Sequence, residues 1–189
     1  MGSIARHMVC GMLALLFLCP PALALSSSPT LSRITLANTN ADLLLHLTLE
    51  GSFSEKLKRS VLDGTPASFV FIIRLHQVRD LWFDRQIADL TAVHTIKYDS
   101  LKREFVVRRS WKNNEAEVTP SFEEAQLWMN QIDDFKLIPL SRMDKGAQYQ
   151  ILTKAKVSKK TLPLNLHSVL FFMSFWDEST DWYIIDFTY

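Results

Sequence analysis

The segment ADLLLHLTLE, residues 41–50, decides the fold, because apolar and polar side chains alternate along it. Leucines occupy every odd position from Leu43 to Leu49, and polar residues occupy the even positions from His46 to Glu50. A period of two over this length is typical of a half-buried β-strand. A partner strand is predicted at residues 34–37 and a turn at 38–40, so residues 34–50 are expected to form an antiparallel hairpin.

Further strands are predicted along most of the chain, mainly from aromatic and β-branched side chains and from turn residues between them. They are expected at residues 68–78, 94–98, 104–109, 148–157 and 183–189. The segments 94–98 and 104–109 should pair as a hairpin around the turn at 99–103. For residues 80–93 two interpretations stay open, a short helix or an irregular crossing.

Two helices are predicted, over residues 52–63 and 120–135. The first opens with a capping box, in which the Ser52 hydroxyl accepts from the Glu55 amide, and it ends at Gly64. The second has Thr119 or Ser121 as its cap. Its apolar stripe has helical spacing and consists of Phe122, Ala125, Trp128, Met129, Ile132 and Phe135. We therefore predict an α+β fold, a mainly antiparallel β-sheet or sandwich with two packed helices.

Residues 1–24 have the layout of a secretory signal peptide, with a charged start, a short apolar middle and a small-residue exit. An inner-membrane anchor formed by residues 8–25 is the alternative, although the apolar run is short for a spanning helix. Cys10 and Cys19 both lie in this region. The remaining 165 residues, 25–189, are expected to form a single β-rich domain without disulfides, in the periplasm or outside the cell.

Without the signal segment the chain has 20 basic and 20 acidic residues, which argues against a nucleic-acid binder. Membrane contact is expected only if the N-terminal segment stays uncleaved. The charges occur in blocks, and residues 95–112 hold six basic side chains and two acids. Such blocks commonly neutralise one another within a fold. The alternative is a basic docking rim for a protein partner on the predicted hairpin, formed by Lys102, Arg103, Arg108 and Arg109.

The sequence contains no zinc-protease pattern, nucleophile elbow, phosphate loop or dinucleotide fingerprint. No catalytic residue, metal site or cofactor is therefore predicted. One hypothesis for an enzyme rests on a small cationic site in which His46 and His76 face each other on paired strands, with Arg74 nearby. A solvated sheet face explains these three residues equally well.

Tryptophans on an exposed face bind sugars or peptides by stacking, whereas tryptophans in a disulfide-free domain more often pack in the core. Trp128 fits the core, since it lies on the predicted helix stripe. The candidates for an exposed groove are Trp82, Trp111 and Trp176.

The sequence of the predicted hairpin also resembles that of a known family. Its sequence YDSLKREFVV, residues 98–107, resembles the signature segment of the bacterial domain of unknown function family 4390. Asp99 stands where histidine is common in that family, and Phe105 stands where tyrosine is common. Three shorter features agree with it: LDGTP at 62–66, SFEEA at 121–125 and Leu162-Pro163. The resemblance implies an exported protein without an assigned activity, and some similar proteins are encoded beside a membrane sensor kinase.

Three functions follow as expectations. The leading one is a non-catalytic periplasmic protein-interaction module, linked to a membrane sensor kinase, that binds through the basic docking rim. The alternative is a small-molecule or lipid-binding module with a groove around residues 69–75 and 169–176. The third is an enzyme that uses His46, His76 and Arg74.

Overall fold

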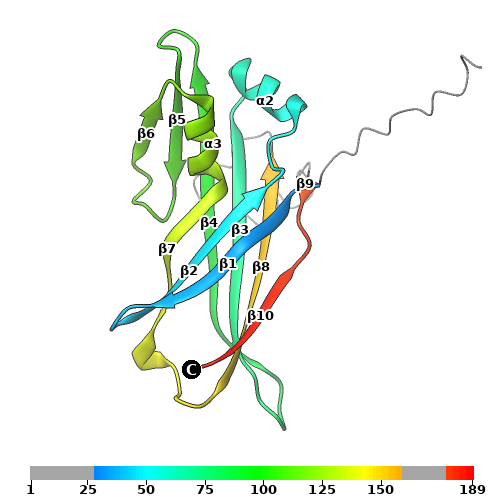
Figure 1. The fold of residues 1–189 in the computed structure, drawn as a ribbon, viewed down its shortest axis with the longest axis vertical. Coiled ribbons are helices and arrows are strands. Elements are labelled where there is room, and N and C mark those ends of the chain that lie inside the picture. The colour runs from blue at the N-terminus through cyan, green and yellow to red at the C-terminus, as the bar shows by residue number, and fades with distance from the viewer. Residues whose placement is uncertain (1–27, 159–177) are drawn as a thin grey trace, which may run out of the picture.

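The computed structural model describes residues 28–158 and 178–189, which form two antiparallel sheets and two α-helices (Figure 1). The smaller sheet has the order β1-β2-β7, with β1 at Thr30–Asn38, β2 at Asp42–Glu50 and β7 at Gln131–Pro139. The larger sheet has the order β10-β8-β3-β4-β5-β6, and β9 also pairs with β8. Its strands are β10 (Tyr183–Thr188), β8 (Gln148–Ser158), β3 (Ala67–Gln77), β4 (Arg85–Asp99), β5 (Glu104–Arg109), β6 (Ala116–Thr119) and β9 (Glu178–Ser179). The α+β class with two packed helices is confirmed.

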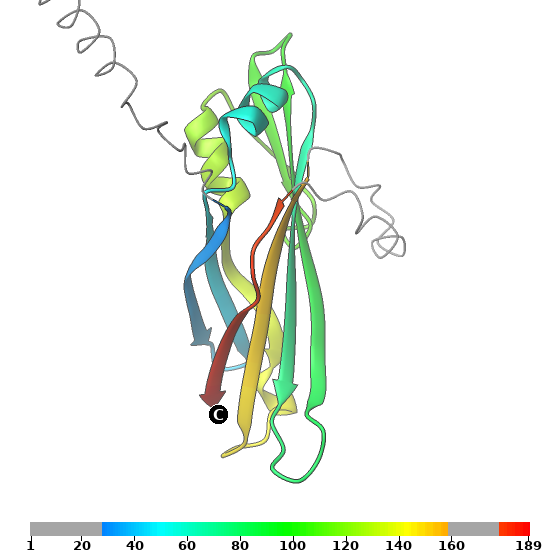
Figure 2. The same ribbon diagram turned by 90° about the vertical axis from the view of Figure 1, so that its right-hand side faces the viewer.

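The core lies between the two sheets, which pack face to face (Figure 2). The odd-numbered leucines of β2 are buried as the alternation predicts, and β1 pairs with β2 as expected. From the larger sheet, β3 contributes the side chains from Phe69 to Leu75 that share one face. The predicted signal segment and residues 169–176 of the expected groove, which include Trp176, lie outside the described residues.

Helix α2 spans Glu55–Leu62 and is shorter than the predicted helix 52–63. The predicted Ser52 cap is wrong, because Ser54 is the N-cap and its hydroxyl accepts from the Leu57 amide at 3.3 Å. The Ser52 hydroxyl instead donates to the Asn130 side chain at 2.6 Å, which ties this loop to the end of the second helix. Gly64 ends the helix region with φ +85°, as expected of a left-handed position.

Helix α3 spans Phe122–Asn130, with Ser121 as N-cap, and the predicted continuation to residue 135 is wrong. The backbone turns extended at Gln131 and continues as β7, where Ile132 and Phe135 pair with strand β2. Ile132 and Phe135 are three residues apart, a spacing that also occurs on one face of a helix. In β7 this spacing arises because the register with β2 shifts between them and Asp134 has φ +57°. Such an irregularity inserts an extra residue, so both side chains stay on the core side of the strand.

Both interpretations of residues 80–93 are wrong, because most of this region is strand: β4 begins at Arg85 and runs for 15 residues, with one register shift opposite Leu75 and His76. At about 3.3 Å per residue it is roughly 50 Å long. The turn that precedes it, Val78–Asp84, is the β3–β4 tip, and the turn that follows it, Asp99–Arg103, lies in the β4–β5 tip. Figures 1 and 2 place these two tips at opposite ends of an elongated molecule.

Candidate functional site

The β4–β5 tip is an exposed and locally fixed turn. One carboxylate oxygen of Asp99 accepts from the amides of Leu101 and Lys102, at 3.0 and 3.2 Å. Arg103 has φ +57°, so the chain turns back through a left-handed residue into β5. Leu101 is 95% exposed, and Lys102 and Arg103 are exposed beside it. Asp99 therefore closes this turn with its own side chain.

Below the turn, the rings of Tyr98 and Phe105 lie 4.7 Å apart across the hairpin. The two residues are directly paired between β4 and β5. A cross-strand aromatic pair of this kind stabilises a hairpin by about 0.2–1 kcal/mol. The tip is thus supported at its base.

The four residues of the predicted docking rim do not form one surface. Lys102 and Arg103 lie at the β4–β5 tip, whereas Arg108 is exposed on β5 and donates to the Asn114 carbonyl at 2.9 Å. Arg109 was expected in the rim, but it is only 5% exposed, because adjacent residues of a strand point to opposite faces. The accessible basic positions are therefore Lys102, Arg103 and Arg108.

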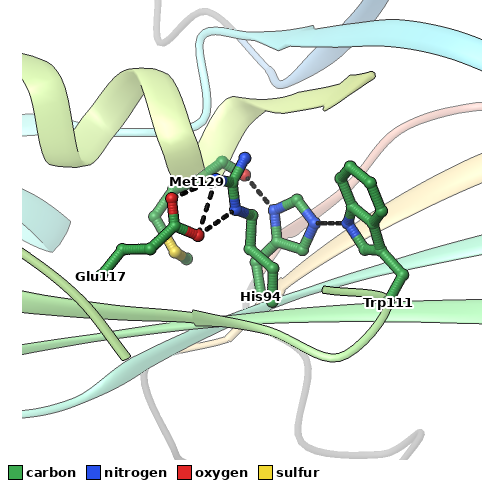
Figure 3. Close-up of polar contacts among 5 residues, drawn as sticks. His94, Trp111, Glu117 and Met129 are labelled. Carbon is green, nitrogen blue, oxygen red and sulfur yellow. Dashed lines mark hydrogen bonds and ion pairs between the residues drawn. The ribbon is translucent and has the colours of Figure 1, made fainter. Parts of the chain in front are cut away.

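Arg109 is buried and belongs to a polar cluster with His94, Trp111 and Glu117. Figure 3 shows His94, Trp111 and Glu117 with Met129 of α3. The Arg109 guanidinium donates to both carboxylate oxygens of Glu117 on β6. On β4, His94 is paired in register with Arg109. His94 Nδ1 lies 2.9 Å from the Met129 carbonyl oxygen, and Trp111 Nε1 donates to His94 Nε2 at 2.9 Å.

These partners define the protonation of His94. Nε2 accepts a hydrogen bond from the indole, so the proton of the neutral ring lies on Nδ1, which donates to Met129. Burial lowers the pKa of His94 from 6.5 to about 3, and the positive charges of Arg109 and Lys112 act in the same direction. The Met129 carbonyl belongs to the last turn of α3, where carbonyls have no partner within the helix. His94 thus fixes the end of α3 and the orientation of Trp111.

Beside this cluster, Trp111 and Phe135 line an open cavity of about 600 Å³. Their rings meet edge to face at 6.0 Å. The other lining residues come from the β1–β2 turn and from strands β2 and β7: Thr39, Asp42, Leu44, Asp134 and Lys136. Lys136 Nζ and Asp42 Oδ2 form an ion pair at 2.7 Å. For the groove expected around residues 69–75 and 169–176, the core-facing side chains of the first segment are buried between the sheets, and the second segment lies outside the described residues.

The three candidate tryptophans differ in their surroundings. Trp82 is 74% exposed at the β3–β4 tip. Trp111 is half-buried and packs against the core, so it forms a cavity wall rather than an exposed groove. Trp176 lies outside the described residues.

The proposed cationic site of His46, His76 and Arg74 is not assembled. His46 lies on β2 of the smaller sheet, whereas His76 and Arg74 lie on β3 of the larger sheet. The expected strand pairing is therefore wrong. His46 Nδ1 accepts from the Asp134 amide at 3.3 Å, and Arg74 Nε lies 3.5 Å from an Asp89 carboxylate oxygen.

Sequence reasoning missed two features. It did not select His94 or Glu117, although both lie on the core-facing side of strands where a buried polar residue needs a partner. It also missed the run Leu81-Trp82-Phe83, whose side chains are 95%, 74% and 87% exposed. The acids at either end, Asp80 and Asp84, were the available signal that this run belongs to a loop.

Within residues 28–158 and 178–189, no cluster of three or more histidine, cysteine, aspartate or glutamate side chains could hold a metal ion. In the same described part of the chain, no helix is long and apolar enough to cross a membrane.

Comparison with known proteins identifies a family for this chain. No curated protein and no solved structure matches the chain. Residues 26–186 match the family described as "Domain of unknown function (DUF4390)", which agrees with the resemblance seen in the hairpin sequence. Because this match covers most of the chain, the protein belongs to the DUF4390 family.

Proposed function

We propose that this protein is an exported, non-catalytic interaction module that binds a protein partner in the periplasm through the β4–β5 tip. The observation that carries the proposal is the fixed turn that presents Leu101, 95% exposed, beside exposed Lys102 and Arg103. Asp99 and the Tyr98–Phe105 pair order this turn before any partner arrives. Ordering a loop in advance lowers the entropic cost of binding.

The chemistry of the tip defines its partner. An apolar side chain beside two cations fits an acidic protein surface with a small hydrophobic depression. Charges at a rim mainly accelerate association and make it sensitive to salt, while the apolar contact slows dissociation. The outer portion of a membrane sensor kinase is a partner of this kind that the family resemblance suggests.

A non-catalytic role is supported by the state of the buried cluster. Both ring nitrogens of His94 are occupied by hydrogen bonds within the protein, and Arg109 is paired with Glu117. A general base needs a free nitrogen within reach of a substrate proton. The cluster instead stabilises the packing of α3 on the larger sheet.

The test is a pull-down from envelope extract at low and high salt, with the Lys102→Glu/Arg103→Glu double variant against the unaltered chain. Arg108→Glu is the matched control, since Arg108 is an exposed base on β5 outside the tip. The tip variant should lose its partner by about tenfold at low salt, whereas the control should retain it. If both variants recover the same proteins as the unaltered chain, the β4–β5 tip is not the binding surface.

A second candidate function is the binding of a small molecule in the cavity lined by Trp111 and Phe135, which is about 600 Å³ in volume. This volume is in the range of small-molecule sites. Native mass spectrometry of protein isolated from its own envelope tests it. A co-purifying ligand that is absent from a Trp111→Ala variant would support this function, and absence of any ligand from the unaltered protein would contradict it.

A further inference from the structure

We infer that the β3–β4 tip inserts into the interface of a lipid bilayer through Leu81, Trp82 and Phe83. This site lies at the opposite end of the molecule from the β4–β5 tip (Figures 1 and 2). The inference therefore goes beyond the proposed function and adds a membrane contact that does not need an uncleaved N-terminal segment. It concerns lipid as a partner, not a second protein.

The first observation is the exposure of three large apolar side chains in succession. Leu81, Trp82 and Phe83 are 95%, 74% and 87% exposed, and with Leu101 they are the four most exposed large apolar side chains in the described residues. Leaving three such side chains in water carries a cost of about 1.5–3 kcal/mol each relative to burial. A contiguous apolar surface of this kind marks a contact site.

The second observation is that the base of this tip is held in place. The Arg79 amide donates to the Asp84 carboxylate at 3.3 Å, which closes the loop below its apex. Asp144, from the segment before β8, accepts from the Gln77 side chain at 2.9 Å and lies 3.9 Å from the Arg85 guanidinium. The apex is therefore carried on a fixed support, so its insertion requires little ordering of the chain.

The shape of the apex favours lipid over a protein pocket. Leu81, Trp82 and Phe83 lie in the turn of a single hairpin, so they offer far less area than the roughly 800 Å² that each partner of a stable protein complex buries. A fluid bilayer surrounds such an apex without shape complementarity. Tryptophan prefers the membrane–water interface, where its ring is in the apolar layer and its N–H remains hydrated.

The charges around the apex match a neutral lipid surface. Two bases and two acids flank the apolar run: Arg79, Asp80, Asp84 and Arg85, all exposed. This collar is formally neutral, so it matches zwitterionic headgroups and gives no preference for anionic lipid. Binding should therefore depend on the apolar side chains and only weakly on salt.

The experiment measures flotation of the full chain, isolated after export, with phosphatidylcholine vesicles at low and high salt. The Leu81→Ser/Trp82→Ser/Phe83→Ser variant should bind at least about tenfold more weakly than the unaltered chain. Leu101→Ser is the matched control, because Leu101 is 95% exposed at the other tip, and it should bind like the unaltered chain. The Lys102→Glu/Arg103→Glu variant should also bind normally, which separates this inference from the proposed function.

A retained N-terminal anchor would carry every variant to the vesicles, so a second readout reports the tip alone. Lipids brominated on their acyl chains should quench part of the tryptophan fluorescence of the unaltered chain. Trp82→Phe should remove most of that quenching, since Trp82 is the tryptophan that lies in the β3–β4 tip.

Two results would overturn the inference. One is quenching by brominated lipid that is the same with and without Trp82. The other is an unaltered chain that stays unbound at every vesicle concentration. If a photoreactive group at position 83 then cross-links to one polypeptide in intact envelopes, the tip is a protein contact instead.

Discussion

Lowering the pH from 7 to 4 should destabilise the fold through His94 by about 3 kcal/mol. In the unfolded chain this imidazole binds a proton below its ordinary pKa of 6.5, whereas in the folded protein burial keeps it neutral until about pH 3. Between these values the unfolded state holds one more proton, so stability falls as the pH falls. One proton corresponds to about 1.36 kcal/mol per pH unit. The contribution of His94 is therefore complete above pH 6.5 and decreases down to about pH 3.

The assay is urea unfolding at pH 7, 6, 5 and 4 for the unaltered chain and for His94→Asn. Asparagine does not titrate, and its amide can still donate to the Met129 carbonyl. The variant loses the acceptor for Trp111 Nε1, so it should be less stable at pH 7 by about 1–3 kcal/mol. Below pH 6.5 its free energy of unfolding should nevertheless decrease less steeply than that of the unaltered chain. The difference between the two slopes should be about 1.36 kcal/mol per pH unit.

His46→Asn is the matched control, because it makes the same replacement on the half-buried polar side of β2. The unaltered chain and His94→Asn differ in one titrating group, so their comparison isolates the His94 imidazole. If His94→Asn and the unaltered chain lose stability in parallel between pH 6 and pH 4, the reasoning about a neutral buried histidine is refuted.

Three further changes test other parts of the fold. Glu117→Ala leaves the Arg109 guanidinium buried without its partner and should lower the free energy of unfolding in urea by about 3 kcal/mol. A decrease below about 1 kcal/mol would mean that water hydrogen-bonds the guanidinium in place of Glu117. Leu45→Ala removes a side chain that is 0% exposed between the sheets and should cost about 2–5 kcal/mol, whereas Leu127→Ala, at a position 50% exposed, should be nearly neutral. Ser54→Ala removes the N-cap of α2 and should lower the free energy of unfolding by about 1 kcal/mol; no change would mean that the Leu57 amide is satisfied in another way.

The parts of the fold that follow regular periods could be predicted from the sequence. The alternation in residues 41–50 predicted β2 and its buried leucines, and the two hairpins around 38–40 and 99–103 formed as expected. Ser121 was one of two predicted caps and is the one used. In each case a local pattern and the tertiary packing favour the same structure.

The prediction failed where an irregular backbone imitated a regular period. The apolar positions of α3 and β7 share a helical spacing, but Asp134 at φ +57° produces that spacing inside a strand. No single-sequence pattern distinguishes these two origins. Similarly, Ser52 and Ser54 are both close enough to the start of α2 to serve as its N-cap. Ser52 instead hydrogen-bonds Asn130, which is 78 positions away in the sequence, so the local pattern does not identify the cap.

The candidate site was only partly predictable, for a different reason. Lys102 and Arg103 are exposed because they follow a turn, and the turn was visible in the sequence. Arg108 and Arg109 are neighbours on a predicted strand, so strand alternation already required that they point to opposite faces. The burial of Arg109 could have been anticipated, although its pairing with Glu117 depends on the placement of β6.

The regular run of β4 from Ala88 to Ile96 restricts how relatives of this protein can vary in length. Inserting one residue between Ala88 and His94 without a new bulge would turn every later side chain over, so that Thr95 would occupy the interior and His94 would face water. Insertions and deletions in this stretch should therefore come in pairs of residues, each pair changing the separation of the two tips by roughly 7 Å. Matching changes are required in β3, which pairs with β4 over the Arg85–Ile96 stretch.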